Sequence, residues 1–209
     1  MLKEKGVHQE ETQWITQARQ GNADAFANLV VKYQKKVFGV CYRMLGTPTA
    51  AEDAAQEAFI RAYQALDSYD PNRSFATWVL SIASNYCIDQ IRKRKVTLLS
   101  IDSEKYGWMA PPTQEPTPER ALVDKEKQAQ VHALLEKLNE TDRAAVVLQF
   151  WHDFSYQEIA EALSLSVSAV KSRLFRARKA MAEEWQKETL VSQSIHLSSE
   201  RIAHETPTI

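Results

Sequence analysis

The stretch from Ser155 to Met181 constrains the fold of this chain more than any other, because it has the pattern of two helices around a tight turn. Ser155 and Glu158 have the spacing of a capping box, which predicts that the first helix begins there. Ser166 is a favourable N-cap for a second helix after the turn at 164–166. Apolar residues recur at three-four spacing along this second helix, so we expect one side of it to be buried.

The opposite side of the second helix has the composition of a nucleic-acid contact. From Ser166 to Met181 there are five basic residues and no acidic one. Arginine and lysine bond guanine edges or phosphates, and an exposed phenylalanine packs on a thymine methyl group. A solvated helical hairpin with a basic face is the alternative, but the capping box, the turn and the lack of acid favour a DNA-reading helix-turn-helix. The residues expected to face DNA are Ser168, Lys171, Ser172, Arg173, Phe175, Arg176 and Arg178.

The composition of the whole chain predicts an all-α protein with little affinity for free DNA. Only five of its 209 residues are glycine, and strong helix formers fill its long runs. The formal net charge is −1. Because phosphate neutralisation supplies most non-specific affinity for DNA, we expect weak binding by the isolated chain. A second macromolecule is therefore expected to complete the binding surface.

No pattern in the sequence indicates catalysis, a metal site or a cofactor. The five histidines include no pair spaced three or four apart, and no P-loop, G-x-S-x-G or G-x-G-x-x-G occurs. Cys41 and Cys87 are expected to be buried reduced thiols, although a disulfide between them is possible. The polar N-terminus and the lack of a long apolar run predict a soluble protein of the cytoplasm.

The segment from Pro48 to Leu66 predicts a helix that begins at a proline, after Gly46 has ended the preceding helix. One side of this helix is rich in alanine and should face the core. The other side is a polar stripe interrupted by Ile60. That stripe is either an ordinary solvated face or a docking surface for another helix.

The next segment combines a turn with a helix that ends in four consecutive cations. Asp70-Pro71-Asn72 predicts the turn, and Ser74 can cap the helix that follows. Its cationic end, 92–95, suits phosphates, although such runs are usually solvated surface. Aromatic and amide side chains beside a basic run can also hold unstacked bases. The expected core stripe of this helix is Phe75, Trp78, Val79, Ile82 and Tyr86.

These segments carry a family resemblance. The motif DAAQEAF at Asp53–Phe59, and FATWV at Phe75–Val79 with Asn85 and Arg92 after it, resemble the second conserved region of extracytoplasmic-function (ECF) sigma factors. The helical hairpin with its VKSR motif at Val170–Arg173 resembles their fourth region. The resemblance spans roughly residues 24–183 in the family's order and spacing, and within the sigma-70 family it is nearest to the sigma-W type.

The resemblance implies a sigma factor that binds core RNA polymerase and directs it to promoters in an envelope-stress response. It implies two small helical domains, region 2 at 10–95 and region 4 at 119–188, joined by an extended linker at 96–118. A membrane-bound anti-sigma factor is an implied partner, beside the polymerase and promoter DNA. The rival hypothesis from the residues alone is a stand-alone helix-turn-helix regulator, and a helical enzyme is a distant third.

The resemblance also implies roles for particular residues. The implied contacts with the polymerase's coiled coil are Asp53, Gln56, Glu57, Phe59 and Ile60. The implied contacts with the −10 element are Tyr69, Asn72, Arg73, Phe75, Asn85, Arg92, Lys93 and Arg94. In the −35 element, Lys171, Ser172, Phe175 and Arg176 would read bases, whereas Arg173 and Arg178 would hold phosphates. Ser168-Ala169 replaces the family's usual Gly-Thr, so the base contacts of the first turn are expected to differ.

The segment 96–118 contains four of the chain's seven prolines, and acidic residues outnumber basic ones around it. Both features argue against a packed core and predict a linker. Its 23 residues can extend to roughly 75 Å, which is the length of about 22 base pairs. It is either a plain tether or a mimic of nucleic acid. The recognition helix is expected to end near residue 190, with a disordered tail at 189–209.

Overall fold

The computed structural model describes the backbone of residues 2–98 and 128–204, and the side chains of 9–96 and 128–187. This described part holds helices, turns and loops but no strand, which confirms the all-α prediction. Its elements are α1 (Leu2–Arg19), α2 (Ala23–Leu45), α3 (Pro48–Gln64), the 3-10 turn η1 (Leu66–Ser68), α4 (Phe75–Leu98), helical residues 128–136, α6 (Glu140–His152), α7 (Tyr156–Ala162) and α8 (Val167–His204).

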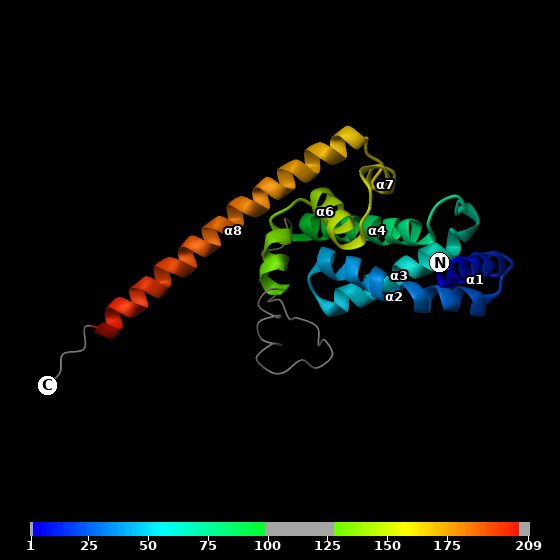
Figure 1. The fold of residues 1–209 in the computed structure, drawn as a ribbon, viewed down its shortest axis with the longest axis horizontal. Helices are drawn as coiled ribbons and strands as arrows, with labels where there is room; N and C mark the ends of the chain where they lie inside the picture. The colour runs from blue at the N-terminus through cyan, green and yellow to red at the C-terminus, as the bar shows by residue number, and fades with distance from the viewer. Residues whose placement is uncertain (1, 99–127, 205–209) are drawn as a thin grey trace.

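Helix α2 is the centre of the N-terminal unit and packs against α1, α3 and α4 (Figure 1). The Asn22 side chain accepts a hydrogen bond from the Ala25 N–H and caps its start. Gly46 ends it in the left-handed conformation, with φ of 84°, which a residue with a Cβ adopts only at a cost. Its apolar stripe is buried, so this helix and its stop are as predicted.

Helix α3 begins as the sequence predicts, with Thr47 as the N-cap and Pro48 in the first turn. Its alanine side is fully buried, with Ala51, Ala58 and Ala62 at 0% exposure. These small side chains let α3 lie close to its neighbours, and its polar side is left at the surface. The chain then turns through η1 into the loop before α4.

Helix α4 differs from its predicted form in two ways. Leu80, Cys87 and Ile88 are buried, whereas the expected core residues Trp78 and Ile82 are only partly covered. The reason is that α4 packs on α2 and α3 on one side and on α6 and α7 on the other, so more than one stripe is covered. Helix α4 also continues into the predicted linker as far as Leu98, because no glycine or proline interrupts it there. The rest of that linker, and residues 119–127 of predicted region 4, lie outside the described residues.

The C-terminal unit contains the predicted helix-turn-helix. Asn139 caps α6, and the full capping box of Ser155 and Glu158 starts α7. The largest fully buried side chains of this unit come from four different helical segments, Leu135, Leu148, Ile159 and Leu174. Truncating one such leucine to alanine typically costs about 2–5 kcal/mol, so this small core holds the hairpin in a fixed shape.

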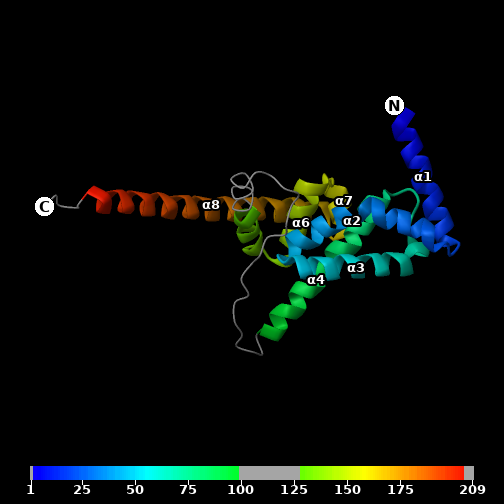
Figure 2. The ribbon, with the colours of Figure 1, turned by 90° about the horizontal axis from the view of Figure 1, so that it is seen from below.

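Helix α8 is longer than the sequence predicts. It runs to His204 rather than ending near residue 190, and so takes in most of the tail expected to be disordered. No glycine or proline occurs between residues 182 and 204, so nothing in the sequence forces an end. Figures 1 and 2 show the second half of α8 projecting away from the other helices.

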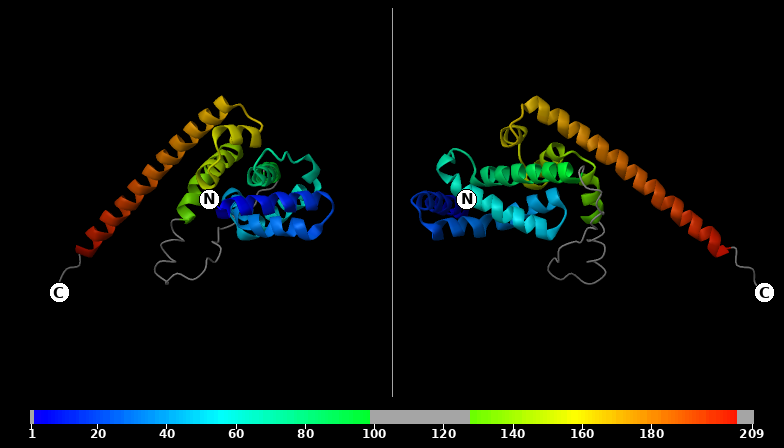
Figure 3. Two further views of the ribbon diagram at one scale, coloured as in Figure 1. Left: turned by 45° about the vertical axis from the view of Figure 1, so that its right-hand side comes forward. Right: turned by 180° about the vertical axis from the view of Figure 1, so that it is seen from behind.

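The two units pack directly on each other. Helix α6 contacts both α2 and α4, and α7 contacts α4 (Figure 3). Their buried side chains form one continuous hydrophobic cluster. Cys41 and Cys87 are buried and free, with no disulfide between them. Within the described residues, no helix has the length and apolar character needed to span a membrane.

Candidate functional site

The outer side of α3 forms a shallow apolar groove with α2. The groove has a volume of about 820 Å³ and is lined by Val30, Gln34, Lys35, Phe38, Glu52, Ala55, Gln56, Phe59 and Ile60. Ile60, which lines the groove, is 52% exposed. Asp53 and Gln56 are exposed beside it, and the Glu57 carboxylate accepts a hydrogen bond from Arg61 Nε at 2.8 Å. This geometry suits the docking of an amphipathic helix.

Phe59 belongs to this groove only in part. The family resemblance implies that Phe59 is a docking residue, but its side chain is buried, with 8% exposure. Its ring therefore supports the floor of the groove from the core. The exposed members, Gln56 and Ile60, are the residues able to touch a partner.

The loop between η1 and α4 is held by an anchor in α1. The Arg19 guanidinium donates hydrogen bonds to the backbone carbonyls of Leu66, Asp67 and Tyr69. Its side chain thereby ties two residues of η1 and the first residue of the loop to the end of α1. No sequence motif pointed to Arg19, since an arginine at the end of a helix is ordinary.

Two residues expected to contact the −10 element are core residues in this structure. Phe75 is 0% exposed and packs against the rings of Tyr33, Tyr69 and Trp78. Tyr69 is 5% exposed, and its hydroxyl donates to the Arg73 carbonyl. The assignment of these two aromatic residues to DNA contact is therefore wrong for this conformation. They support the loop from beneath, whereas Asn72 and Arg73 lie on its surface.

Polar side chains of α4 and of the loop before it bond to the C-terminal unit while they remain partly exposed to solvent. Arg73 Nη2 lies 3.1 Å from Glu161 Oε2, and Thr77 Oγ1 donates to Glu158 Oε1 at 3.1 Å. Asn85 Nδ2 donates to the Ala162 carbonyl at 2.8 Å.

A third carboxylate, that of Glu140, lies near the far end of α4. Arg92 Nε and Lys95 Nζ each lie 3.0 Å from the Glu140 carboxylate. Glu140 is in the first turn of α6, and its own backbone N–H, with help from Lys95 and Arg92, lowers its pKa to about 2.

The second helix of the helix-turn-helix presents the expected polar face to solvent. Ser166 Oγ accepts from the Ala169 N–H at 3.2 Å and caps the helix, after a turn in which Ser164 has φ of 54°. Ser168, Lys171, Ser172, Arg176 and Arg178 are exposed, and Phe175 is 64% exposed. An exposed phenylalanine among cations and hydroxyls, on a helix that no neighbour covers there, fits contact with a DNA groove.

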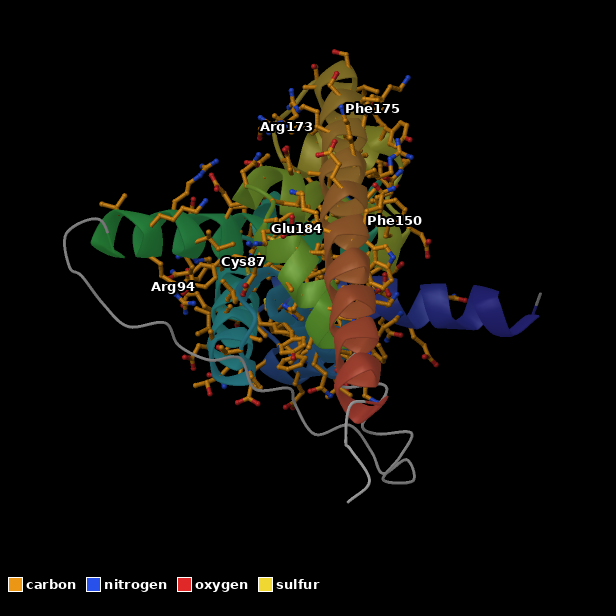
Figure 4. All side chains as sticks on the ribbon, turned by 90° about the vertical axis from the view of Figure 1, so that its left-hand side faces the viewer. Cys87, Arg94, Phe150, Arg173, Phe175 and Glu184 are labelled. Carbon is orange, nitrogen blue, oxygen red and sulfur yellow. The ribbon has the colours of Figure 1, made fainter. Side chains whose placement is uncertain are left out.

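Arg173 has a different role from the one expected of it. Its Nη1 donates to Asp142 Oδ1 at 2.7 Å, and the Asp142 side chain is only 8% exposed. Figure 4 shows Arg173 and Phe175 on opposite sides of α8. The Arg173 guanidinium is thus used to hold α8 against α6, which removes it from the set of free phosphate contacts.

The junction between the units also contains buried basic groups that sequence reasoning missed. Arg143 Nη1 donates to the Met44 carbonyl at 2.7 Å, in the last turn of α2, where carbonyls lack intrahelical donors. The Arg43 guanidinium stacks over the Trp151 ring at 4.9 Å. Burial, with the nearby Arg143 and Arg43 charges, lowers the pKa of His132 to about 4. No sequence signal placed these residues together.

The described residues hold no group of three histidine, cysteine or acidic side chains arranged to bind a metal ion. The features that remain are an apolar groove for a helix, a polar face on α4 and an exposed basic recognition helix. All three are suited to binding macromolecules.

Two family models match the chain in the same order as the two units of the fold. Sigma-70 region 2 matches residues 29–97, and Sigma-70, region 4 matches residues 128–181. Among solved structures, CnrH in complex with the cytosolic domain of CnrY has a TM-score of 0.61 at 28% identity, with 85% of this chain and 98% of that chain covered.

Proteins that match over most of the chain belong to the same family as the two family models. The chain is 40% identical over 176 residues to the ECF RNA polymerase sigma factor SigW of Bacillus subtilis (strain 168), covering 81% of this chain and 94% of that protein. It is 34% identical over 172 residues to the ECF RNA polymerase sigma-E factor of Escherichia coli (strain K12), covering 80% and 90%. The chain therefore belongs to the ECF sigma factors of the sigma-70 family, which direct RNA polymerase to promoters and are not a class of enzymes.

Proposed function

We propose that this chain docks on core RNA polymerase through the α3 groove and reads the two promoter elements with α4 and α8. The observation that carries this proposal is the pairing of an exposed recognition surface at 166–181, with five basic residues and no acidic one, with an apolar groove on the other unit. The groove offers Gln56 and Ile60 to a partner helix, and α8 offers Lys171, Phe175 and Arg176 to a DNA groove.

The net charge of the chain supports a need for polymerase in promoter binding. At −1, the chain lacks the excess of cations that gives a stand-alone regulator its affinity for duplex DNA. Promoter binding should therefore need core polymerase. Tight, sequence-specific binding by the isolated chain at physiological salt would instead favour the stand-alone regulator.

On the −10 element, we assign contacts to Asn72, Arg73, Asn85, Arg92, Lys93 and Arg94. All of them lie in the loop before α4 or along α4. Amide and guanidinium groups suit exposed base edges and phosphates of an opened strand. Phe75 and Tyr69 shape the loop beneath them without touching DNA.

On the −35 element, Arg176 is the residue whose loss should change sequence preference. Arg176→Ala is expected to cost about 1–3 kcal/mol, concentrated at one base position. The matched control is Lys179→Ala, one turn along the exposed side of α8, which should weaken binding slightly and equally for all sequences. Both can be measured as transcription from a set of single-base promoter variants. A uniform loss for Arg176→Ala would make it a phosphate contact.

We further propose that the chain works in the cytoplasm, where the polymerase is, in a response to envelope stress. A membrane-bound anti-sigma factor is the expected regulator. The support is the likeness to CnrH, which was solved with the cytosolic domain of another protein. Copurification from detergent-solubilised membranes tests this partner, and recovery of polymerase alone would remove it.

A further inference from the structure

A second cavity, which we call the junction pocket, lies where the two units meet. Helix α2 and the start of α4 form one side of it, and the end of α6 with the turn before α7 forms the other. Its volume is about 480 Å³, within the range of roughly 300–1,000 Å³ found for small-molecule sites. Lys35 is the one lining residue that it shares with the α3 groove. The pocket is therefore a site of its own.

Three cations of α2 line the junction pocket, namely Lys35, Lys36 and Arg43. Within the described residues none of the three forms an ion pair. Other cations nearby do, since Lys32 on the same helix pairs with Glu11 and Arg73 pairs with a carboxylate of α7. The pocket thus collects positive charge that the described part of the chain does not neutralise.

The acidic side chains of the lining do not remove this excess. They are Asp153, which is exposed, and Glu158, whose carboxylate already accepts hydrogen bonds from Ser155 and Thr77. Three cations therefore face two carboxylates, in a chain whose own net charge is −1. A local excess of positive charge of this kind suits an anionic ligand.

The cations converge on an imidazole that has no partner. His152 Nε2 is buried and makes no hydrogen bond within the described part of the chain. Burial, followed by the charges of Arg43 and Lys36, lowers the pKa of His152 to about 4, so the ring is neutral at pH 7. A buried polar atom without a partner is costly. A ligand in the pocket can supply that partner.

A glycine in the middle of α2 leaves room for Arg43. Glycine is less favourable than alanine inside a helix, yet Gly39 lines the pocket near the centre of α2. A Cβ at this position would lie 3.1 Å from Arg43 Nη1. The guanidinium instead donates to the Gly39 carbonyl at 2.9 Å and lies 4.9 Å from the centroid of the Trp151 ring. The local sequence thus allows the guanidinium to lie against the pocket.

The lining indicates a phosphate rather than a carboxylate. A phosphate monoester carries about −1.5 to −2 charges at neutral pH and three acceptor oxygens, which match several cations and the Ser74 hydroxyl that also lines the pocket. The rest of the lining includes the apolar side chains of Ala76, Leu80 and Phe154. A ligand that fills the pocket therefore needs an apolar part beside its phosphate.

We propose that the junction pocket binds a small organic phosphate, with the phosphate on Lys36, Arg43 and His152 and the apolar part against Leu80 and Phe154. Both units contribute to the site. A bound ligand therefore stabilises the chain by mass action in the arrangement that forms the pocket. This goes beyond the proposed function, because it gives the chain a small-molecule effector.

An NMR titration of the full chain tests the site with phenyl phosphate as the probe. The amide signals of Gly39 and Phe154 should shift and saturate, whereas that of Phe175 on the exposed face of α8 should not. Inorganic phosphate should bind at least about tenfold more weakly, because it leaves the apolar side empty. Phenol should not shift these signals.

Two results would overturn the proposal. Shifts confined to α8 would show that phosphate binds only to the recognition helix. Equal binding of phenol and phenyl phosphate would show that the cations do not recognise the ligand.

A charge variant tests the contacts at an exposed position, where the fold is not at risk. Lys36→Glu should weaken binding of phenyl phosphate at least about tenfold. The control is Lys187→Glu, which makes the same change of charge at a side chain 72% exposed on α8 and should keep full affinity. An equal loss in both variants would reduce the binding to general attraction by net charge and end the proposal.

A shape variant tests the cavity without changing any charge. In Gly39→Leu the new side chain occupies the space beside Arg43, so the affinity for phenyl phosphate should be lost. A folded Gly39→Leu chain that binds as tightly as the wild type would place the phosphate outside the pocket. The result for Lys36→Glu decides the matter if Gly39→Leu does not fold.

These measurements use the free chain, without polymerase or promoter DNA. Their failure leaves the proposed function intact, and a failure to start transcription leaves the junction pocket intact.

Discussion

The two sides of the N-terminal unit differ in whether other helices of the molecule pack on them. The α3 side carries an open groove with Ile60 half exposed, and nothing in the described part of the chain packs on it. The α4 side is bonded along its length to α6 and α7. Both sides carry residues assigned to binding partners, so exposure alone does not identify a binding surface. A surface can be functional and be occupied by its own chain.

The most severe change expected on the open side is the double variant Gln56→Ala with Ile60→Ala. A half-exposed isoleucine in a groove is the kind of anchor that carries binding energy, so core polymerase affinity should fall by about 2 kcal/mol, roughly thirtyfold. Val31→Ala is the control, because Val31 is 67% exposed on α2 but does not line the groove. Competition binding with labelled wild-type chain measures both.

Retained affinity in the double variant, with an unchanged melting temperature, would remove the groove as the docking surface. It would also erase the contrast between the two sides, since the open side would then have no assigned partner.

The covered side should respond to Arg143→Met, which keeps the length of the side chain but removes its hydrogen bond to the Met44 carbonyl. Losing a charge-assisted hydrogen bond across the junction is expected to cost about 1.5–3 kcal/mol. The two units should then separate more often. A carbodiimide crosslink between Lys95 and Glu140, which lie 3.0 Å apart, should therefore form in lower yield, while polymerase binding is retained. Lys137→Met removes an exposed cation of the same unit and should change neither.

A crosslink of full strength in Arg143→Met would show that the junction does not depend on this arginine. The carboxylate contacts along α4 would then be the main link between the units, and the comparison would rest on them alone.

A smaller effect is expected from acid, again on the covered side only. Burial, together with the Arg43 and Lys36 charges and against the opposing Asp153 carboxylate, lowers the pKa of His152 to about 4. His132 is lowered to the same value by burial, Arg143 and Arg43. The usual pKa of histidine is about 6.5, so the unfolded or separated chain takes up protons first. Stability is therefore complete above pH 6.5 and falls as the pH drops toward 4.

His132 is buried and His152 is partly exposed, and we expect a loss of about 1 kcal/mol per histidine across that range. Thermal unfolding at several pH values between 7.5 and 4.5 measures it. His152→Gln should flatten part of the slope, and the α3 groove should bind polymerase equally well in both proteins. A slope that is the same with and without His152 would contradict this reading.

The sequence predicted the helices and their ends where local chemistry decides them. The Gly46 stop, the helix start at Pro48 and the Ser155–Glu158 capping box all appear in the structure. Each depends on contacts within a few residues. The exposed face of α8 was also predictable, because the periodicity of apolar residues separates it from the buried face.

The sequence did not predict which polar side chains bond to distant residues of the same chain. Arg173, Asn85 and Arg92 have the composition of DNA contacts, yet they bond to Asp142, Ala162 and Glu140, between 31 and 77 residues away. Nothing local to any of them specifies that partner. The covered side of α4 likewise buries more residues than one helical stripe, because two sets of helices pack on it.

The anchor formed by Arg19 has a consequence for how this protein can change. Its guanidinium bonds to three backbone carbonyls and also lies over the Tyr69 ring, 5.8 Å from its centroid. Every residue type offers the same carbonyl, so exposed loop residues such as Asn72 and Arg73 can be replaced without loss of these three bonds. Selection can thus rewrite the promoter preference of this segment position by position, without having to rebuild the support on which it rests.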